Sequence, residues 1–123
     1  MKILVTGGAG FIGTNVCEHF AEKGAEIIIL DDLSRKGTEK NLRFLKKKIE
    51  GLKFIKGSVT NWKTVRKVFE KNNFDIVFHL AAQVAVTTSV TDPRSDFEVN
   101  ALGAFNILEG ARVTDQSPIM LYS

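Results

Sequence analysis

Val5-Thr6-Gly7-Gly8-Ala9-Gly10-Phe11-Ile12-Gly13 is the stretch that decides the fold of this chain. The preceding apolar run, Ile3-Leu4-Val5, is typical of a buried parallel strand, and the apolar residues that follow share one helical face. The stretch is therefore predicted to join a strand to a helix. In such a turn Gly7 permits the tight bend, Gly10 lets the backbone approach a phosphate, and Gly13 lets the helix pack closely on the strand. A bound anion would meet free N–H groups at the start of the helix.

An acidic pair follows the second apolar run, Ile27 to Leu30. Asp31 lies 18 residues after Gly13, and Asp32 comes next. This is close to the spacing of about 20 residues at which an acidic side chain binds the ribose hydroxyls of NAD. The two motifs together predict a dinucleotide-binding site. The alternative is a purely structural glycine turn in another doubly wound protein.

Length and composition indicate one soluble globular domain that covers residues 1–123, with 44% apolar and 25% charged residues. No apolar run approaches the roughly 18 residues needed to span a membrane, and the first strand starts at Lys2, which leaves no room for a signal peptide. We therefore expect a cytoplasmic protein without a membrane partner. The single cysteine, Cys17, is interpreted as a buried structural thiol. No metal site is predicted.

The net charge of +3 is concentrated between Arg35 and Lys48, where basic residues face only Glu39. A solvated helix face is the favoured interpretation of this run. Steering of an anionic ligand and binding of nucleic acid are the alternatives. No aromatic stacking platform is interleaved with the charges, so no nucleic-acid partner is predicted.

Strands and helices alternate along the chain, which predicts an α/β fold of the Rossmann type. The fold is a doubly wound parallel sheet of about five strands in the order 3-2-1-4-5, in three α/β/α layers. The strands are expected at residues 2–5, 26–30, 52–55, 75–80 and 119–123. Helices are expected to end at Gly24, to carry Leu42, Leu45 and Ile49, to begin after Asn61, and to run from Pro93 to about Val113.

Residues 81–91 show no clear periodicity and are predicted to form a loop. This loop and the glycine turn should converge at the carboxyl ends of strands one and four, where the strand order reverses and a ligand crevice is expected. The predicted 93–113 helix has one apolar face lined by Phe97, Ala101, Ala104, Leu108 and Ala111, and Leu102, Phe105 and Ile107 lie elsewhere around it. Apolar residues on more than one side indicate either core packing or a subunit interface. A homodimer is expected through this helix or through the exposed terminal strand.

Four motifs occur in order: Thr6 to Gly13, Asp31-Asp32-Leu33-Ser34, His79-Leu80-Ala81-Ala82-Gln83, and Phe97-Glu98-Val99-Asn100. Together they resemble the NAD-dependent epimerase/dehydratase branch of the extended short-chain dehydrogenase/reductase superfamily. Leu33 to Gly37, Asn41-Leu42 and Gln83 to Ser89 look most like the CDP-paratose/CDP-tyvelose 2-epimerases. The resemblance spans essentially the whole chain.

The resemblance implies a role in NAD binding for fifteen positions. They are Gly7, Gly10, Phe11, Ile12 and Gly13 at the pyrophosphate; Asp31 at the adenosine ribose, with Asp32, Ser34 and Arg35 beside it; Ser58 and Val59 near the adenine; Ala81, Ala82 and Gln83 along the far half of the cofactor; and Asn100, which braces this last loop. Plain polar loop and helix residues are the alternative for Gln83 and Asn100. Thr87, Thr88 and Ser89 would face the sugar, unless they are ordinary hydroxyls bonded to their own backbone.

Two departures from the family pattern are visible. Ser58 stands where the family usually has an aspartate near the adenine, and its hydroxyl can still form a hydrogen bond. NAD is favoured over NADP, because the two carboxylates of Asp31 and Asp32 would repel an extra phosphate even with Arg35 nearby.

No catalytic residue is predicted in this chain. The family's Ser or Thr after strand five and its Tyr-x-x-x-Lys helix are both absent, and Tyr122, His19 and His79 are interpreted as structural. We therefore expect the cofactor half of an enzyme, inactive alone, whose parent moves a hydride from a nucleotide sugar to NAD and back. CDP-sugar 2-epimerisation is the leading prediction. A UDP-sugar 4-epimerase, a dehydratase, a reductase or a non-catalytic NAD-binding module stays open.

Overall fold

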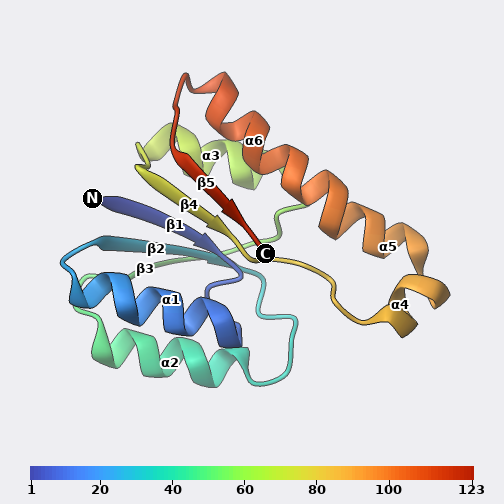
Figure 1. Cartoon of the computed structure of the whole chain (residues 1–123), viewed down its shortest axis with the longest axis horizontal. Coiled ribbons are helices and arrows are strands. Elements are labelled where there is room, and N and C mark those ends of the chain that lie inside the picture. The colour runs from blue at the N-terminus through green and yellow to red at the C-terminus, as the bar shows by residue number, and fades with distance from the viewer.

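A computed structural model describes all of residues 1–123. Its single parallel sheet has the order β3-β2-β1-β4-β5, as predicted (Figure 1). The strands are β1 (Lys2–Thr6), β2 (Glu26–Asp31), β3 (Lys53–Lys56), β4 (Ile76–His79) and β5 (Ile119–Tyr122). The helices α1 (Phe11–Glu22) and α2 (Thr38–Lys48) cover one face, while α3 (Trp62–Lys71) and α6 (Gly103–Val113) cover the other. The three-layer prediction is confirmed.

The core is divided by the sheet into two apolar clusters. Along β1, Ile3 and Val5 pack toward α1 and α2, whereas Leu4 packs toward α3 and α6. Side chains of successive strand residues point to opposite faces, so a strand covered on both sides must be apolar at every position. This explains why the central strands are continuous apolar runs in the sequence.

Three predicted helix ends are confirmed by their geometry. Gly24, just after α1, has a left-handed φ of +86°. The Asn61 side chain caps α3 by accepting a hydrogen bond from the Thr64 N–H at 3.2 Å. Asp92 accepts from the Ser95 N–H at 3.2 Å, and Pro93 occupies the first helical position after it. Each signal is local, so the sequence alone predicted it.

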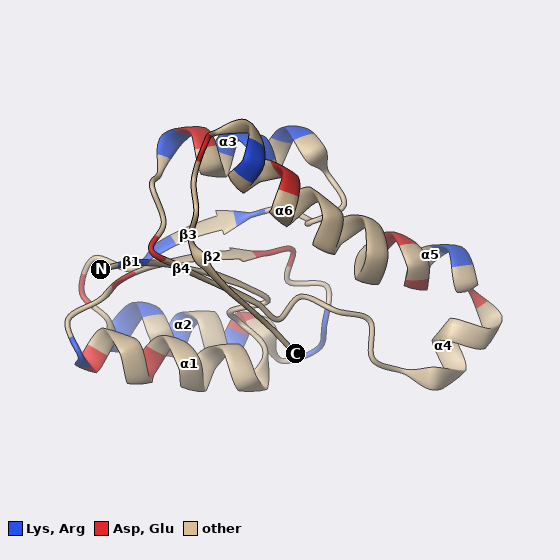
Figure 2. Cartoon of the chain, turned by 45° about the horizontal axis from the view of Figure 1, so that its top comes forward, with Lys and Arg blue, Asp and Glu red and all other residues tan.

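The segment between β4 and β5 differs from the prediction in two ways. The predicted loop contains a short helix, α4 (Val86–Thr91), and the predicted 93–113 helix is α5 (Pro93–Phe97), then a π-helical turn, η1 (Glu98–Leu102), and then α6. A six-residue helix of Val, Thr and Ser shows no usable periodicity and has low helix propensity, so the pattern could not reveal it. α4 and α5 project to one side of the sheet (Figures 1 and 2).

The apolar face lined by Phe97, Ala101, Ala104, Leu108 and Ala111 does not form the core, except at Ala111. Phe97 and Leu108 are exposed, and the buried residues of α6 are Gly103, Asn106, Ile107, Gly110 and Ala111. The π-helical turn is wider than an α-helical turn, so it rotates α6 relative to the phase expected from Phe97. The two glycines also allow close packing: a Cβ on Gly110 would lie 2.8 Å from an atom of the Phe69 ring on α3.

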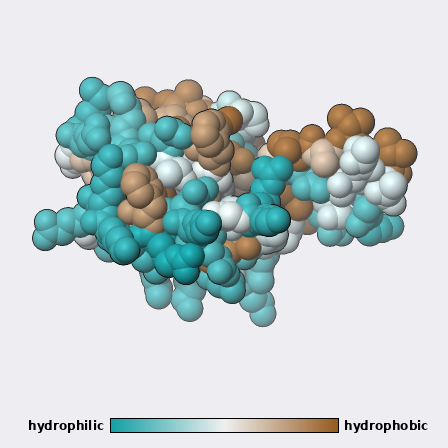
Figure 3. All heavy atoms as spheres, turned by 90° about the horizontal axis from the view of Figure 1, so that it is seen from below, coloured by the Kyte–Doolittle hydropathy of each residue, from teal (hydrophilic) through white to brown (hydrophobic).

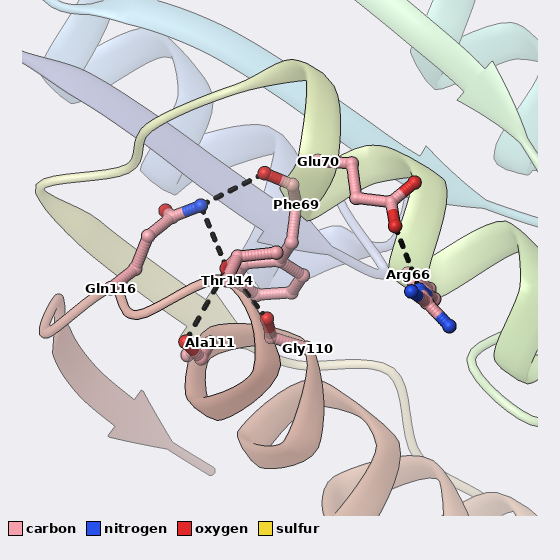
Figure 4. A network of polar contacts seen from close by, with 7 residues as sticks. All are labelled: Arg66, Phe69, Glu70, Gly110, Ala111, Thr114 and Gln116. Atoms are coloured by element: carbon pink, nitrogen blue, oxygen red, sulfur yellow. Dashed lines mark hydrogen bonds and ion pairs between the residues drawn. The ribbon is translucent and has the colours of Figure 1, made fainter.

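Gln116 ties the end of α6 to α3 (Figure 4). Its side-chain amide donates to the carbonyl oxygens of Phe69 and Asn72, each at 2.8 Å, and its oxygen accepts from the Phe74 N–H at 2.9 Å. Thr114 closes α6 by donating to the Gly110 carbonyl at 2.7 Å. These bonds hold the C-terminal end of α6 against α3. The N-terminal end of α6 therefore lies toward the crevice side of the sheet.

Apolar side chains are exposed on the projecting part of the chain (Figure 3). They include Val84, Val86, Val90 and Phe97, and Phe105 is exposed on the neighbouring α6. β5 is bonded to β4 on one side only, and Tyr122 is also exposed. None of the helices has both the length and the apolar character to cross a membrane.

Candidate functional site: a crevice where the strand order reverses

The glycine turn and the loop after β4 are in direct contact. Gly7 has a left-handed φ of +69°, and its N–H donates to the Leu30 carbonyl at 2.9 Å. A Cβ on Gly7 would lie 2.8 Å from the Ala81 backbone nitrogen. Only glycine satisfies both the conformation and this close approach. The predicted convergence of the two loops is therefore present.

Gly13 lets α1 pack onto the turn. A Cβ at this position would lie 2.6 Å from the Gly8 Cα. Gly10, in contrast, has an extended backbone (φ −75°, ψ 177°) as the residue that caps α1. The free end of α1 thus opens on the crevice, with backbone N–H groups available to an anion.

Cys17 lies beneath this turn in the apolar layer and is fully buried. Burial, with a smaller effect of the Glu18 charge, raises the pKa of its thiol to about 12. A thiol with such a pKa stays protonated at neutral pH and is a poor nucleophile. The structural interpretation of Cys17 is consistent with this environment.

Asp31 ends β2 and connects two segments of the site. Its Oδ2 accepts from the Ala9 N–H at 3.0 Å, and its Oδ1 accepts from the Leu33 N–H at 2.8 Å. Leu33 has a left-handed φ of 59°, a conformation that non-glycine residues rarely adopt. A carboxylate has about four acceptor positions, so Asp31 keeps capacity for further donors in the crevice.

Thr6 fixes the start of the loop after β4. Its fully buried hydroxyl oxygen accepts from the N–H groups of Leu80 and Ala81, each at 3.2 Å, and lies 2.8 Å from His79 Nδ1. The Leu80 N–H also donates to the Thr6 backbone carbonyl at 3.1 Å. Which of the Thr6 hydroxyl and His79 Nδ1 donates depends on the tautomer of the ring. Burial lowers the pKa of His79, which favours the neutral ring.

Asn100 holds the next part of this loop from the π-helical turn. Its Oδ1 accepts from the Gln83 N–H at 2.7 Å, and its Nδ2 donates to the Gln83 carbonyl at 2.9 Å. Nδ2 also lies 3.2 Å from an Asp96 carboxylate oxygen. The Asn100 side chain therefore satisfies both backbone groups of Gln83, as the expected brace between loop and helix requires.

These segments enclose a crevice of about 130 Å³. Most of the residues expected at the cofactor line it: Gly7, Gly10, Asp31, Asp32, Ser34, Arg35, Ser58, Val59, Ala81, Ala82 and Gln83. Four others surround it without lining it. Phe11 and Ile12 are exposed at the start of α1, Gly13 is buried under the turn, and Asn100 lies behind Gln83.

Five lining residues were not expected: Leu30, Thr38, Gly57, Leu80 and Val99. Thr38 is the informative one, because it is a buried polar residue at the start of α2. Its hydroxyl donates to the Arg35 carbonyl at 2.7 Å, so it shapes the loop that carries Ser34 and Arg35. A hydroxyl just after Gly37, at a helix start, was the available signal.

The three hydroxyls expected to face a sugar lie outside the lining of this crevice. Thr87, Thr88 and Ser89 are on α4, outside the crevice lining. Ser89 donates to the Val86 carbonyl at 2.6 Å, and the Thr87 carbonyl accepts from Thr91. In this structure Ser89 therefore bonds the backbone of its own helix.

Basic residues are spread along α2 (blue in Figure 2). Lys48 pairs with Glu18 and Glu22 of α1, and the Lys46 ammonium lies 5.4 Å from the centre of the Phe54 ring. Arg35, at the crevice, is the member of this run that lines the site. Ion pairs and an aromatic neighbour account for two of the charges without any external ligand.

The doubly wound sheet, the glycine turn before α1 and the acidic end of β2 define a Rossmann-like domain with a nucleotide-binding type of crevice. A family model described as GDP-mannose 4,6 dehydratase matches residues 4–123, and the chain belongs to this family. The resemblance to epimerases and dehydratases is thereby confirmed.

Individual relatives agree with this assignment. The chain is 40% identical over 123 residues to a CDP-paratose 2-epimerase of Salmonella typhi, covering 100% of this chain and 36% of the relative. It is 38% identical over 124 residues to a putative UDP-glucose 4-epimerase of Methanocaldococcus jannaschii, covering 98% and 37%. A crystal structure of Thermus thermophilus UDP-glucose 4-epimerase in complex with NAD matches with a TM-score of 0.81 and 38% identity, over 94% of this chain and 35% of that one. The chain thus spans about a third of each.

Proposed function

We propose that residues 1–123 form a single NAD-binding domain and that the crevice at the carboxyl ends of β1 and β4 receives the cofactor. The observation that carries the proposal is the meeting of three features in one crevice: the glycine turn, Asp31 and the loop from Ala81 to Gln83. The NAD complex of the Thermus thermophilus relative supports it.

In this proposal the pyrophosphate lies at the start of α1, near Gly10, Phe11, Ile12 and Gly13. Backbone N–H groups and the helix dipole stabilise the negative charge there. Asp31 accepts hydrogen bonds from the adenosine ribose, and Ser58 and Val59 lie near the adenine. Ala81, Ala82 and Gln83 contact the far half of the cofactor.

The crevice favours NAD over NADP. Asp31 and Asp32 place two carboxylates at the ribose end, where an extra phosphate would be repelled. Arg35 lines the same crevice, and its positive charge reduces this repulsion. The preference for NAD therefore depends on the balance between the two carboxylates and this guanidinium. We expect the two neighbouring carboxylates to dominate.

For the whole protein we propose a nucleotide-sugar epimerase. When bound, NAD supplies reversible acceptance of a hydride from a sugar carbon, and the domain described here binds and orients it. CDP-sugar 2-epimerisation is the leading assignment because of the 40% identity to the Salmonella typhi relative. UDP-sugar 4-epimerisation is the second, supported by the Methanocaldococcus jannaschii and Thermus thermophilus relatives. We further propose a cytoplasmic location, and no turnover by residues 1–123 alone.

Calorimetric titration of the purified chain with NAD, and with NADP as the comparison, tests the proposal. We expect saturable binding of NAD and weaker binding of NADP. A chain that binds neither nucleotide would contradict the proposed function, and a chain that prefers NADP would contradict the role given to Asp31 and Asp32.

A further inference from the structure

The peptide groups on both sides of Ala9 are held by side chains from other elements. Ala9 is fully buried in the glycine turn. Its N–H donates to Asp31 Oδ2 at 3.0 Å, and its carbonyl accepts from Asn41 Nδ2 at 2.8 Å. Asn41 belongs to α2 and is separated from Ala9 by 32 positions.

These two bonds set the orientation of successive peptide planes. The Ala9 carbonyl belongs to the same planar unit as the Gly10 N–H, so fixing the oxygen also fixes the direction of that N–H. The Gly10 N–H in turn donates to the Gly7 carbonyl at 3.0 Å, across the turn. Asn41 therefore controls the peptide that leads into the start of α1, where the proposed pyrophosphate lies.

The side chain of Asn41 is not needed by its own helix. Its backbone N–H already donates to the Gly37 carbonyl at 3.3 Å. Removing the side-chain amide would leave a carbonyl of a buried residue without its partner, and such a loss favours rearrangement of the turn. α2 also follows the loop with Ser34 and Arg35, so Asn41 links the ribose side of the crevice to the turn.

We propose that Asn41 is a positioning residue for the turn that receives the pyrophosphate, an inference that rests on the NAD-binding function proposed above. It acts through Ala9 and does not contact the ligand. A ligand with phosphates therefore depends on Asn41, whereas a nucleoside that meets only Asp31 and the adenine side does not. A merely structural role would weaken both ligands together.

Two variants, Asn41→Leu and Asn41→Ala, remove the donor without adding charge. Asn72 offers matched controls, Asn72→Leu and Asn72→Ala, because its side-chain amide makes the same kind of bond at 2.9 Å, to the Val68 carbonyl, far from the crevice. The affinities of ADP and adenosine are measured for all five proteins by titration. We expect about tenfold weaker ADP binding for both Asn41 variants, as follows from one lost hydrogen bond. Adenosine affinity should change by less than about twofold.

The wild-type chain gives a second measurement that needs no substitution. In NMR titrations the side-chain amide signals of Asn41 should shift with ADP and stay in place with adenosine, and those of Asn72 should stay in place with both. An unchanged ADP-to-adenosine affinity ratio in the Asn41 variants, or equal effects in the Asn72 variants, would overturn the inference. If the wild-type protein binds neither ligand, that result would contradict the proposed function and, with it, this inference.

Discussion

Gly10 and Gly13 stand only three positions apart, yet the structure gives them separate roles. A Cβ on Gly13 would lie 2.6 Å from the Gly8 Cα, which is backbone and cannot move aside. At Gly10 the backbone suits any residue, and the nearest atom to a Cβ is the Gly7 carbonyl oxygen at 3.2 Å. Gly13 is therefore required for packing, whereas Gly10 leaves space in front of α1.

We therefore expect Gly13→Ala to lower the free energy of unfolding by about 3 kcal/mol, the cost of a forced overlap in a packed site. Gly10→Ala should change it by about 1 kcal/mol or less and still weaken NAD binding, because the added methyl group occupies the phosphate's approach. Urea unfolding and calorimetry separate the two effects. Equal stability losses in both variants would contradict this division.

Thr6 is the residue on which the loop after β4 depends. Thr6→Val keeps the shape but removes the hydroxyl that bonds Ala81 and His79, while the Leu80 N–H keeps its bond to the Thr6 backbone carbonyl. We expect a loss of about 2 kcal/mol in unfolding free energy, because buried polar groups lose a partner. Thr6→Ser, which keeps the hydroxyl, is the control. A valine variant as stable as the serine variant would show that these bonds contribute nothing.

His79 should make stability depend on pH. Burial lowers the pKa of the folded ring below its ordinary value of 6.5, so the unfolded chain binds more protons as the pH falls below that value. The contribution of His79 to stability is therefore present at neutral pH and is lost on acidification through 6.5 toward the lowered folded pKa.

The variant His79→Asn isolates this effect, since its side-chain amide can hydrogen-bond to Thr6 but does not titrate. Between pH 7.5 and 5.5 we expect the wild type to lose more unfolding free energy than the variant. Parallel stability curves for the two proteins would show that His79 does not titrate differently on folding.

At the scale of elements, the sequence predicted those features that depend on local or periodic signals. The strand order and the helical layers on the two faces of the sheet follow from alternating apolar runs, and the caps at Asn61 and Asp92 follow from single side chains. The π-helical turn at Glu98–Leu102 left no such signal. It shifts the phase of α6, so the buried face centred on Ile107 could not be read from helical periodicity.

The residues of the candidate site also fall into two groups, those that a local sequence signal predicts and those that it does not. Gly7, Gly10 and Asp31 could be found from motif spacing, because these residue types are needed for local backbone geometry and for charge. Val99 lines the crevice from η1, which left no signal in the sequence, whereas the hydroxyl of Thr38 directly after Gly37, at the start of α2, did offer one. The bond from Asn41 to Ala9 joins residues that are distant in sequence, and no local rule predicts such a pair.

The contact between α3 and α6 gives a test at this scale. A Cβ on Gly110 would overlap the Phe69 ring, so Gly110→Ala should lower the unfolding free energy by about 2 kcal/mol. In the background of Phe69→Leu the same substitution should cost about 1 kcal/mol less, because the smaller side chain leaves room. Denaturant titrations of the wild type, the two single variants and the double variant complete this double-mutant cycle. Strict additivity would indicate that the two positions do not interact.

For the whole molecule, the homodimer expected from the sequence stays a prediction, with an interface at the long helical segment or at β5. Phe105 is exposed on α6, and Leu121 is exposed on β5. Phe105→Arg should convert a dimer into a monomer if the helical segment forms the interface, and Leu121→Arg should do so if the strand edge forms it. Sedimentation velocity distinguishes the two. A wild-type chain that is monomeric at all concentrations would contradict the prediction.

The central claim is that NAD binds in the crevice between the glycine turn and the loop after β4. Amide NMR spectra of the labelled chain, recorded during titration with NAD, test this claim most directly. We predict saturable shifts at Gly10, Asp31 and Gln83, with little change at Asn72 and Gln116 on the opposite side of the molecule. Shifts confined to residues outside the crevice, or no shifts at all at millimolar NAD, would contradict the account.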